Sequence, residues 1–179
     1  MLNKETIPIL GEFSAECESN VAVKPSTEYI VLTRREGLRL QSGPGRDLIF
    51  KVTGEDTNGA FDYFIVEVAP YGGPPLHIHH RQEETIHVLK GRFKVRIGDE
   101  LFYLNEGDFA YLPSNVPHAF LNLTADPAEI IIVYTPGGGH KFYEELGPLT
   151  RNGSPDKSVV AELFAKYDMT LLGPPLSRD

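Results

Sequence analysis

The 179-residue sequence contains a single cysteine, Cys17, and no tryptophan. One cysteine cannot form a disulfide within the chain, and nothing in the cysteine usage indicates an oxidising compartment. The sequence also lacks apolar runs of membrane-spanning length, and its first residues, MLNKETIPILGEF, lack the apolar core of a signal peptide. These absences predict a cytoplasmic protein that does not enter a membrane.

Positive charge is scarce as well. Seventeen Lys and Arg stand against 25 Asp and Glu, which gives a formal net charge of −8 without any long basic run. Because nucleic-acid-binding surfaces depend on clustered Lys and Arg, the composition argues against nucleic acid as a partner. The length suits one domain with a sizeable core and is too short for two comfortable ones.

Short strands dominate the pattern that is present. Segments rich in aromatic and β-branched residues alternate with turns rich in Gly, Asn and Asp. The expected strands are residues 28–33, a short strand within 34–47, and 48–53, 61–70, 92–97, 100–104, 108–113, 119–123 and 129–136. In 92–97, Lys94 and Arg96 would share the solvent face of a half-buried strand. The series has no βαβ rhythm and predicts an all-β sandwich or jelly-roll barrel.

The tail changes character after residue 136. The stretch GGGHKFYEELG predicts a loop and a short helix that ends at Gly147, since glycine commonly stops helices. Ser154 and Pro155 suit the opening of a second helix, whose apolar face we expect to pack on the outer surface of the barrel. The ending LLGPPLSRD is expected to form an extended strap.

Metal-binding residue types are densest in residues 74–91, PPLHIHHRQEETIHVLKG. His77 and His79 are two residues apart, so on a strand their imidazoles project from the same face. The polar residues that follow predict a turn that brings Glu84 to face both histidines from a neighbouring strand. A third histidine, His118, arrives downstream in GDFAYLPSNVPHAFLN. Three imidazoles and a carboxylate suit a divalent transition metal.

The spacing of these residues resembles the two signature motifs of the cupins. The first motif is His-x-His, four residues, Glu, six residues and Gly; the second runs from Gly through Pro to His and, three residues later, Asn. The matching residues are His77, His79, Glu84 and Gly91 in the first motif, and Gly107, Pro113, His118 and Asn122 in the second. The resemblance implies the double-stranded β-helix of cupins, a jelly-roll barrel, with a short C-terminal helical segment.

Two positions depart from the cupin pattern. The leading glycine of the first motif falls at Tyr71, with glycines at 72 and 73, so we expect that turn to be slightly shifted. The second-motif glycine is replaced by Asn115, a residue that tolerates a left-handed backbone. Neither departure touches a ligand position.

Other candidate residues fit the pattern less well. Glu83 could rival Glu84, but only Glu84 keeps both the four-residue gap behind it and the six-residue gap ahead of it. His80, His87 and His140 hold no motif position, and by strand parity His87 faces away from Glu84. Structural or surface roles are predicted for these three histidines.

Within the cupins, residues 28–147 resemble the single-domain flavonol dioxygenases, the quercetinases. The segments FDYFIVE, GDFAYLP and TPGGGHKFYEELG carry this likeness beside the motifs. The resemblance implies a small-molecule substrate, a flavonol bound to the metal through its 3-hydroxyl, which O2 opens with release of carbon monoxide. Glu84 would be the catalytic base. The ion held by His77, His79, Glu84 and His118 could be iron, manganese, cobalt, nickel, copper or zinc.

Several alternatives stay open. Another metal-dependent reaction on a small acidic or phenolic compound fits the same ligands, as does a non-catalytic barrel that binds a small molecule or metal. Phe64, Tyr111 and Phe120 could grip a flat substrate, although aromatic residues fill any barrel core.

The expected organisation has three parts. Residues 1–25 form an N-terminal arm, 26–147 the barrel, and 148–179 a C-terminal helix and an extended tail that pack on it. The arm, which has no assigned role, and the frequency of dimers among cupins predict a homodimer.

Overall fold

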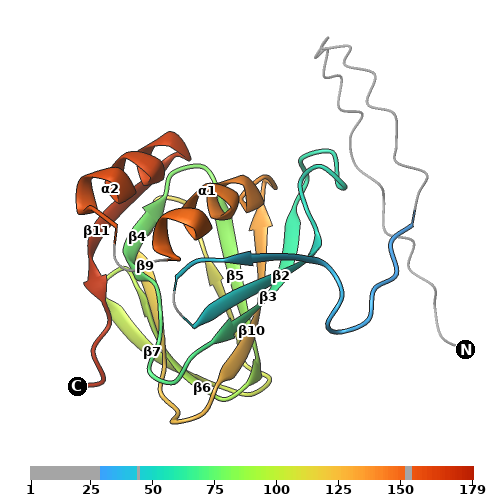
Figure 1. The fold of residues 1–179 in the computed structure, drawn as a ribbon. Coiled ribbons are helices and arrows are strands. Elements are labelled where there is room, and N and C mark those ends of the chain that lie inside the picture. The colour runs from blue at the N-terminus through green and yellow to red at the C-terminus, as the bar shows by residue number, and fades with distance from the viewer. Residues whose placement is uncertain (1–28, 44, 152–154) are drawn as a thin grey trace, which may run out of the picture.

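Two antiparallel sheets face each other and form a barrel in the computed structural model, which describes residues 29–43, 45–151 and 155–179 (Figure 1). The six-stranded sheet contains, in spatial order, β1 (Leu38–Gln41), β2 (Arg46–Val52), β3 (Asp62–Val68), β10 (Ala128–Thr135), β5 (Glu83–Lys90) and β8 (Phe109–Leu112). The five-stranded sheet contains β11 (Met169–Pro175), β4 (Pro75–His79), β9 (His118–Asn122), β6 (Arg92–Ile97) and β7 (Glu100–Asn105). The predicted all-β jelly-roll fold is confirmed.

The core lies between the inner faces of the two sheets. Strand β10 alternates between buried and partly buried residues over most of its length, so that Ile130 and Ile132 point inward. Across the same sheet, the rings of Phe50 and Phe64 stack with their centroids 4.3 Å apart. Burial of each such side chain contributes about 1.5–3 kcal/mol relative to leaving it in water.

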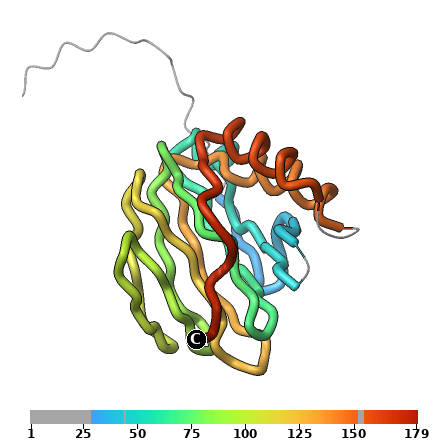
Figure 2. Tube along the Cα trace, turned by 90° about the vertical axis from the view of Figure 1, so that its left-hand side faces the viewer, coloured from blue at the N-terminus to red at the C-terminus, as the bar shows by residue number. Residues whose placement is uncertain are grey.

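Two helices, α1 (His140–Thr150) and α2 (Lys157–Lys166), cover one end of the barrel (Figures 1 and 2). Helix α1 continues past Gly147, so the predicted helix end there is wrong. A Cβ at this position would lie 3.2 Å from the carbonyl oxygen of Gln41, which shows that the glycine allows α1 to approach β1 closely. The cap of α2 is Asp156, whose carboxylate accepts the N–H of Ser158, whereas Ser154 lies outside the described residues.

The apolar face of α2 packs on α1 and on β11, a strand of the five-stranded sheet, at one end of the barrel. A second cluster of buried apolar residues, separate from the core between the sheets, lies at the helix-covered end of the barrel. Its members are Phe142, Leu146, Leu163, Phe164 and Met169. The ring of Phe164 also meets the ring of His77 edge-on, with centroids 5.9 Å apart. Helix α2 therefore lies beside the predicted metal ligands.

The C-terminal segment is more than the predicted strap, because β11 joins the five-stranded sheet and pairs with β4 along the side of the barrel (Figure 2). Its residues Met169 and Leu171 lie opposite His79 and His77. The tail beyond β11 also covers Lys94, which is only 5% exposed. The predicted solvent-facing position of this residue is therefore wrong. The Lys94 ammonium donates to the main-chain oxygens of Ser177 and Asp179.

The prediction of a strand over residues 28–33 is wrong for the described part of that segment. Residues 29–33 form no strand, and Tyr29 and Val31 are 90% and 83% exposed. Apolar composition alone does not determine a strand, because an apolar run becomes a strand only where a sheet edge pairs with it. The predicted arm, residues 1–25, lies outside the described residues. Within the described part of the chain, no helix has the length and apolar character needed to cross a membrane.

The turn before β4 places the backbone close to β9. Tyr71 itself adopts a φ of +57°, so the predicted shift of this turn onto the following glycines is wrong. Asn115 has a φ of +64°, which confirms the left-handed conformation expected of it. Gly73 is required for a different reason: a Cβ there would lie 1.9 Å from the carbonyl oxygen of Phe120.

We expect Gly73→Ala to destabilise the fold by about 3 kcal/mol, because either the turn or β9 must move to remove this clash. The control is Gly173→Ala in β11, where the added Cβ would lie 3.9 Å from the Leu76 side chain. That variant should stay within about 1 kcal/mol of wild type. Urea unfolding followed by circular dichroism measures both, and equal stability of the two variants would contradict the close approach at Gly73.

Candidate metal centre

The structure brings the four predicted ligand residues together on the inside of the barrel. His77 and His79 project from β4, and His118 projects from β9, where it lies directly opposite His77. Glu84 comes from β5 in the opposing sheet and not, as predicted, from a strand neighbouring β4. All four side chains are buried, and one ligand-type atom from each lies within 4.8 Å of the others.

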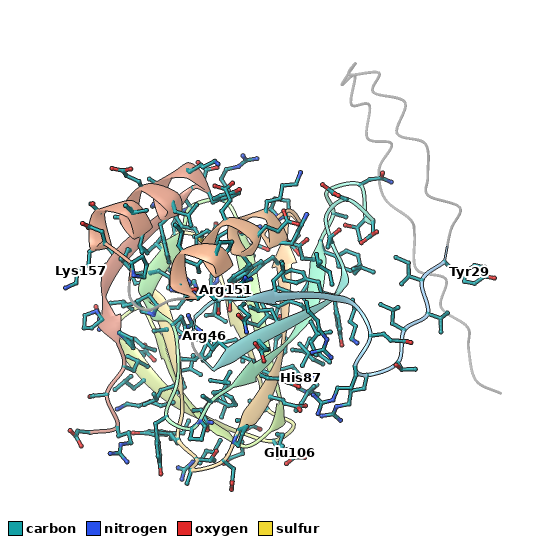
Figure 3. The ribbon with its side chains drawn as sticks, viewed as in Figure 1. Tyr29, Arg46, His87, Glu106, Arg151 and Lys157 are labelled. Atoms are coloured by element: carbon teal, nitrogen blue, oxygen red, sulfur yellow. The ribbon has the colours of Figure 1, made fainter. Side chains whose placement is uncertain are left out.

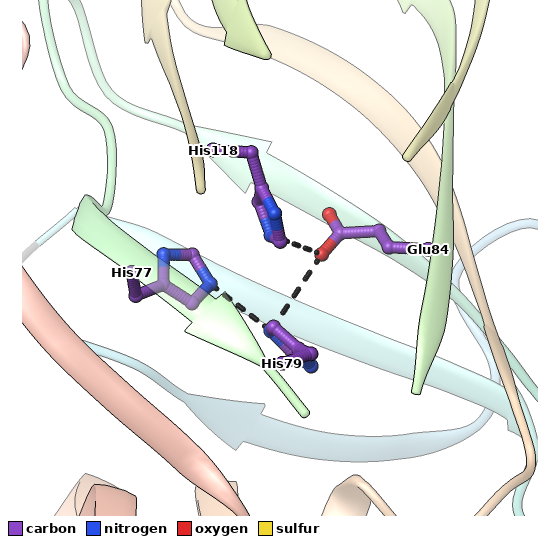
Figure 4. Close-up of side chains that lie close together, drawn as sticks. All are labelled: His77, His79, Glu84 and His118. Carbon is purple, nitrogen blue, oxygen red and sulfur yellow. Dashed lines mark hydrogen bonds and ion pairs between the residues drawn. The ribbon is translucent and has the colours of Figure 1, made fainter. Parts of the chain in front are cut away.

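The atoms that face one another are three imidazole nitrogens and one carboxylate oxygen (Figure 4). Nε2 of His77 lies 3.0 Å from Nε2 of His79. Glu84 Oε2 lies 3.2 Å from Nε2 of His118 and 3.8 Å from Nε2 of His79. No interaction between the other carboxylate oxygen of Glu84 and the histidines is marked in Figure 4.

Each histidine is oriented through its second ring nitrogen. Nδ1 of His77 and Nδ1 of His118 lie 2.9 Å from the carbonyl oxygens of Pro75 and Val116. Nδ1 of His79 lies 3.4 Å from the side-chain oxygen of Gln82. Because these oxygens only accept, each Nδ1 carries the donated proton. The Nε2 lone pairs of the neutral rings are thereby directed toward the centre of the cluster, as in metal-binding histidines.

This arrangement fits a cation. Two imidazole lone pairs 3.0 Å apart repel each other unless a positive charge lies near both. Among the described residues, Glu84 Oε2 and His118 Nε2 are also buried atoms without a hydrogen-bond partner, and such orphaned polar atoms are costly. A divalent transition metal would satisfy all four atoms with the nitrogen and oxygen ligands that it prefers.

The pKa values separate the three histidines. Burial, reinforced by the neighbouring His118 and His79, lowers the pKa of His77 well below its usual value. Burial also lowers the pKa of His79, to about 4. Burial acts in the same direction on His118, but the negative charge of Glu84, 3.2 Å away, outweighs it and raises the His118 pKa above its usual value. Of the three ligand histidines, His118 is therefore the one whose protonated form is favoured in the metal-free chain.

A cavity of about 310 Å³ opens beside the cluster and includes His77, His79 and Glu84 in its walls. Most of its lining is apolar and comes from both sheets and both helices: Leu48, Val66, Phe120, Ile132, Phe142, Leu146, Val160, Phe164 and Met169. Its volume is at the lower end of the range for sites that bind one small organic molecule. The ligand cluster thus lies in the wall of a cavity that a small molecule can occupy.

Polar cavity residues that the sequence did not reveal are Arg46, Tyr134 and Tyr143. The hydroxyl groups of the two tyrosines lie 2.8 Å apart. Strand parity could have found Tyr134, which follows the inward-facing Ile130 and Ile132 at two-residue spacing and lies opposite Glu84. No local signal points to Arg46 or Tyr143, because β2 and α1 reach the cavity only through the tertiary fold.

The rival residues lie elsewhere. Glu83 is exposed, and His87 is exposed on the outer face of β5. His80 is exposed and contacts Asn115 and Thr170 on neighbouring segments. His140 is buried at the start of α1, 3.5 Å from the carboxylate of Asp62. These four residues lie outside the cluster, in line with the spacing argument.

The three aromatic candidates fall in three different places. Phe120 lines the cavity. Phe64 is fully buried in the core and is not a cavity residue, and Tyr111 on β8 is 48% exposed. Of these three predicted residues, only Phe120 is therefore placed to contact a ligand in the cavity.

Comparisons with known proteins agree with this architecture. Residues 64–134 match the family model described as Cupin domain. An uncharacterized protein of Methanocaldococcus jannaschii is 31% identical over 80 residues, which cover 44% of this chain and 64% of the relative. Quercetin 2,3-dioxygenase of Bacillus subtilis is 28% identical over 88 residues, which cover 45% of this chain and 26% of that enzyme. The chain thus spans less than two thirds of either relative.

Solved structures show the same fold. KdgF from a Halomonas species superposes with a TM-score of 0.55 at 18% identity, covering 64% of this chain and 97% of that chain. An RmlC-like cupin from Shewanella frigidimarina gives a TM-score of 0.55 at 16% identity, covering 66% and 99%. At these identities the likeness establishes the fold alone.

We expect wild-type protein from metal-supplemented growth to hold about one divalent ion per chain, and His77→Ala to hold far less. The control is His87→Ala, which removes an exposed imidazole from the outer face of β5 and should retain the ion. With free metal at a hundredfold excess over the dissociation constant, binding should stabilise the fold by about 3 kcal/mol. Elemental analysis and thermal unfolding with and without chelator measure both effects. Equal metal content in the two variants would rule out the cluster as the site.

Metal binding at about pH 6 should release about one proton per chain, because His118 is protonated there while His77 and His79 are not. As the pH falls below the His118 pKa, a proton competes with the metal and the affinity should decrease about tenfold per pH unit. Titration calorimetry in two buffers of different ionisation enthalpy counts the protons. Release of three protons would show that the depressed pKa values of His77 and His79 are wrong.

Proposed function

We propose that this chain is a cupin-type, metal-dependent dioxygenase that opens a flavonol-type substrate with O2, since residues 64–134 match the Cupin domain model and the barrel has the fold of solved cupins. The observation that carries the proposal is the convergence of three histidines and one glutamate in the wall of a largely apolar cavity. The partial likeness to a quercetin 2,3-dioxygenase supports this reaction class.

Under this proposal His77, His79, Glu84 and His118 hold a divalent transition metal. When bound, such an ion favours the deprotonated form of an oxygen that it contacts and helps to orient the molecule that carries it. Four protein ligands leave positions open on an ion that accepts five or six, and an open position distinguishes a catalytic site from a closed structural one.

Glu84 is the proposed base. Glu84 is 2% exposed and lines the cavity, so a ligand bound in the cavity can contact it away from bulk water. One oxygen faces His118 and His79, and the other, for which Figure 4 marks no contact with the histidines, would accept the proton. Transfer of the flavonol 3-hydroxyl proton to this carboxylate leaves an electron-rich flavonolate, which is the form that O2 attacks.

The apolar walls would bind the flat rings of the substrate. Phe120 approaches from β9, and Phe142 and Phe164 approach from the two helices. A ligand that fills this volume displaces water, and each square ångström of apolar surface removed from water contributes about 25 cal/mol. Water exclusion also strengthens the interaction between Glu84 and the substrate hydroxyl.

Quercetin should be consumed in air by protein reconstituted separately with iron, manganese, cobalt, nickel or copper, and one or more of these ions should support turnover. In Glu84→Gln, kcat should fall at least about 100-fold, because the amide cannot take the proton. The control is Glu83→Gln, which makes the same change at an exposed neighbour and should leave kcat within about twofold. Loss of quercetin absorbance measures turnover, and elemental analysis of each variant checks that metal is still bound.

Near-normal turnover in metal-loaded Glu84→Gln would reject the base role. Demonstrated metal uptake without quercetin turnover by any ion would reject the flavonol reaction, and the search would move to other small phenolic or acidic compounds.

A further inference from the structure

Arg46 is the single Lys or Arg among the described residues that line the cavity beside the metal-ligand cluster. It is the first residue of β2, and Figure 3 shows it among the strands beneath α1. The role proposed for the cluster makes no use of it. A cationic side chain in a mostly apolar cavity is costly to bury, so its presence there requires an explanation.

The guanidinium has few partners within the protein. Its Nη2 donates to the carbonyl oxygen of Ser42 at 2.7 Å, and in the described part of the chain it forms no ion pair with a carboxylate. The one acidic residue that shares the cavity wall is Glu84, which faces the three histidines. A guanidinium offers five N–H donors in a planar fork that matches a carboxylate. Burial lowers the Arg46 pKa, and only the phenols of Tyr143 and Tyr134 act against that shift.

Two phenol groups lie in the same cavity. The hydroxyls of Tyr134 and Tyr143 are 2.8 Å apart, so one donates to the other, and the acceptor keeps its own proton for a further partner. Burial raises the pKa of the Tyr143 hydroxyl, which therefore stays protonated at neutral pH. Arg46, Tyr134 and Tyr143 all line this one cavity of about 310 Å³, so a single small ligand can reach all three.

The charge balance of the cavity also favours an anionic ligand. A divalent ion held by three neutral histidines and the Glu84 carboxylate leaves one net positive charge at the cluster. Arg46 adds a second positive charge to the cavity that His77, His79 and Glu84 also line. A neutral ligand would leave both charges uncompensated in a low-dielectric space, whereas an anionic ligand would offset them.

We propose that Arg46, assisted by the Tyr134 and Tyr143 hydroxyl pair, forms a second subsite that binds an ionised oxygen of the substrate. This inference rests on the proposed function insofar as the substrate occupies the cavity beside the metal ligands. It defines the substrate class as small aromatic compounds that carry an anionic oxygen, either a carboxylate or an ionised phenol. Arg46 is then a specificity-determining residue.

A purely structural role for the side chain makes a different prediction. The turn before β2 is closed by main-chain hydrogen bonds, from the N–H of Ser42 to the carbonyl of Arg46 and from the N–H of Arg46 to the carbonyl of Gly43. These bonds do not need the guanidinium. Replacement of Arg46 should therefore alter ligand selectivity more than stability.

The test compares benzoate with its neutral analogue benzamide on the full chain loaded with Zn²⁺, which has no redox chemistry and so prevents turnover. Calorimetry measures both affinities in wild type, Arg46→Gln, Arg46→Lys and the control Arg39→Gln, which changes an exposed arginine on β1. Wild type and Arg39→Gln should bind benzoate at least about tenfold more tightly than benzamide. Arg46→Gln should weaken benzoate binding about 10- to 100-fold and leave benzamide binding within about twofold.

Arg46→Lys keeps the charge but loses the planar fork, so it should fall between wild type and Arg46→Gln. It also keeps the test informative if Arg46→Gln folds poorly. A second pair of probes, 4-nitrophenolate and nitrobenzene, distinguishes the two sources of the ionised oxygen. The pair with the larger Arg46-dependent preference identifies carboxylate or phenolate as the recognised group.

Equal binding of charged and neutral probes by wild type, or an unchanged preference in Arg46→Gln, would overturn the proposal. An unchanged preference would mean that the anion binds the metal alone. The outcome is separable from that of the flavonol reaction. An Arg46-dependent preference without quercetin turnover would retain the subsite and reject the reaction, and turnover without the preference would do the reverse.

Discussion

The lone pairs of His77 and His79 face each other across 3.0 Å in a buried site, and the rest of the cluster is arranged around that contact. The opposite ring nitrogens are already committed as donors to main-chain and amide oxygens, so the rings cannot turn to relieve the repulsion. A proton between the two nitrogens is disfavoured by burial, which lowers the pKa of both rings. A cation with several ligand positions resolves the conflict, and Glu84 supplies the compensating negative charge from the opposing sheet.

The barrel assembles the whole ligand cluster because its two sheets contribute different ligands. Strands β4 and β9 bring the histidines side by side, while β5 lies across the interior and carries Glu84. The helix-covered end is fixed by a second buried carboxylate. Asp62 accepts N–H groups from Gly138 and Gly139, and so holds the glycine-rich loop that leads into α1. Helix α1 then places Phe142 and Tyr143 in the cavity wall, so that a structural carboxylate shapes the space beside the ligand cluster.

Strand parity and motif spacing predicted the ligand cluster from the sequence, because both are local properties. The two-residue period places His77 and His79 on one face and turns His87 outward. Local signals failed where long-range packing decides the outcome. Gly147 looks like a helix stop but serves as a close-packing point against Gln41. Lys94 follows the polar alternation of its strand, yet the C-terminal tail covers it.

The same division separates the chemistry of the site from its selectivity. The candidate ligands come from three strands between residues 75 and 122, a stretch whose spacing can be recognised in a sequence. Much of the cavity wall comes from β2, from the helices and from β11, which are far from the ligands along the chain. Proteins with the same ligand spacing can therefore differ in many of the other residues that line the cavity, which is how one fold supports many reactions. In this chain Arg46, Tyr134 and Tyr143 add polar groups to that mostly apolar wall, so under the proposed subsite substrate choice would depend on groups outside the motif.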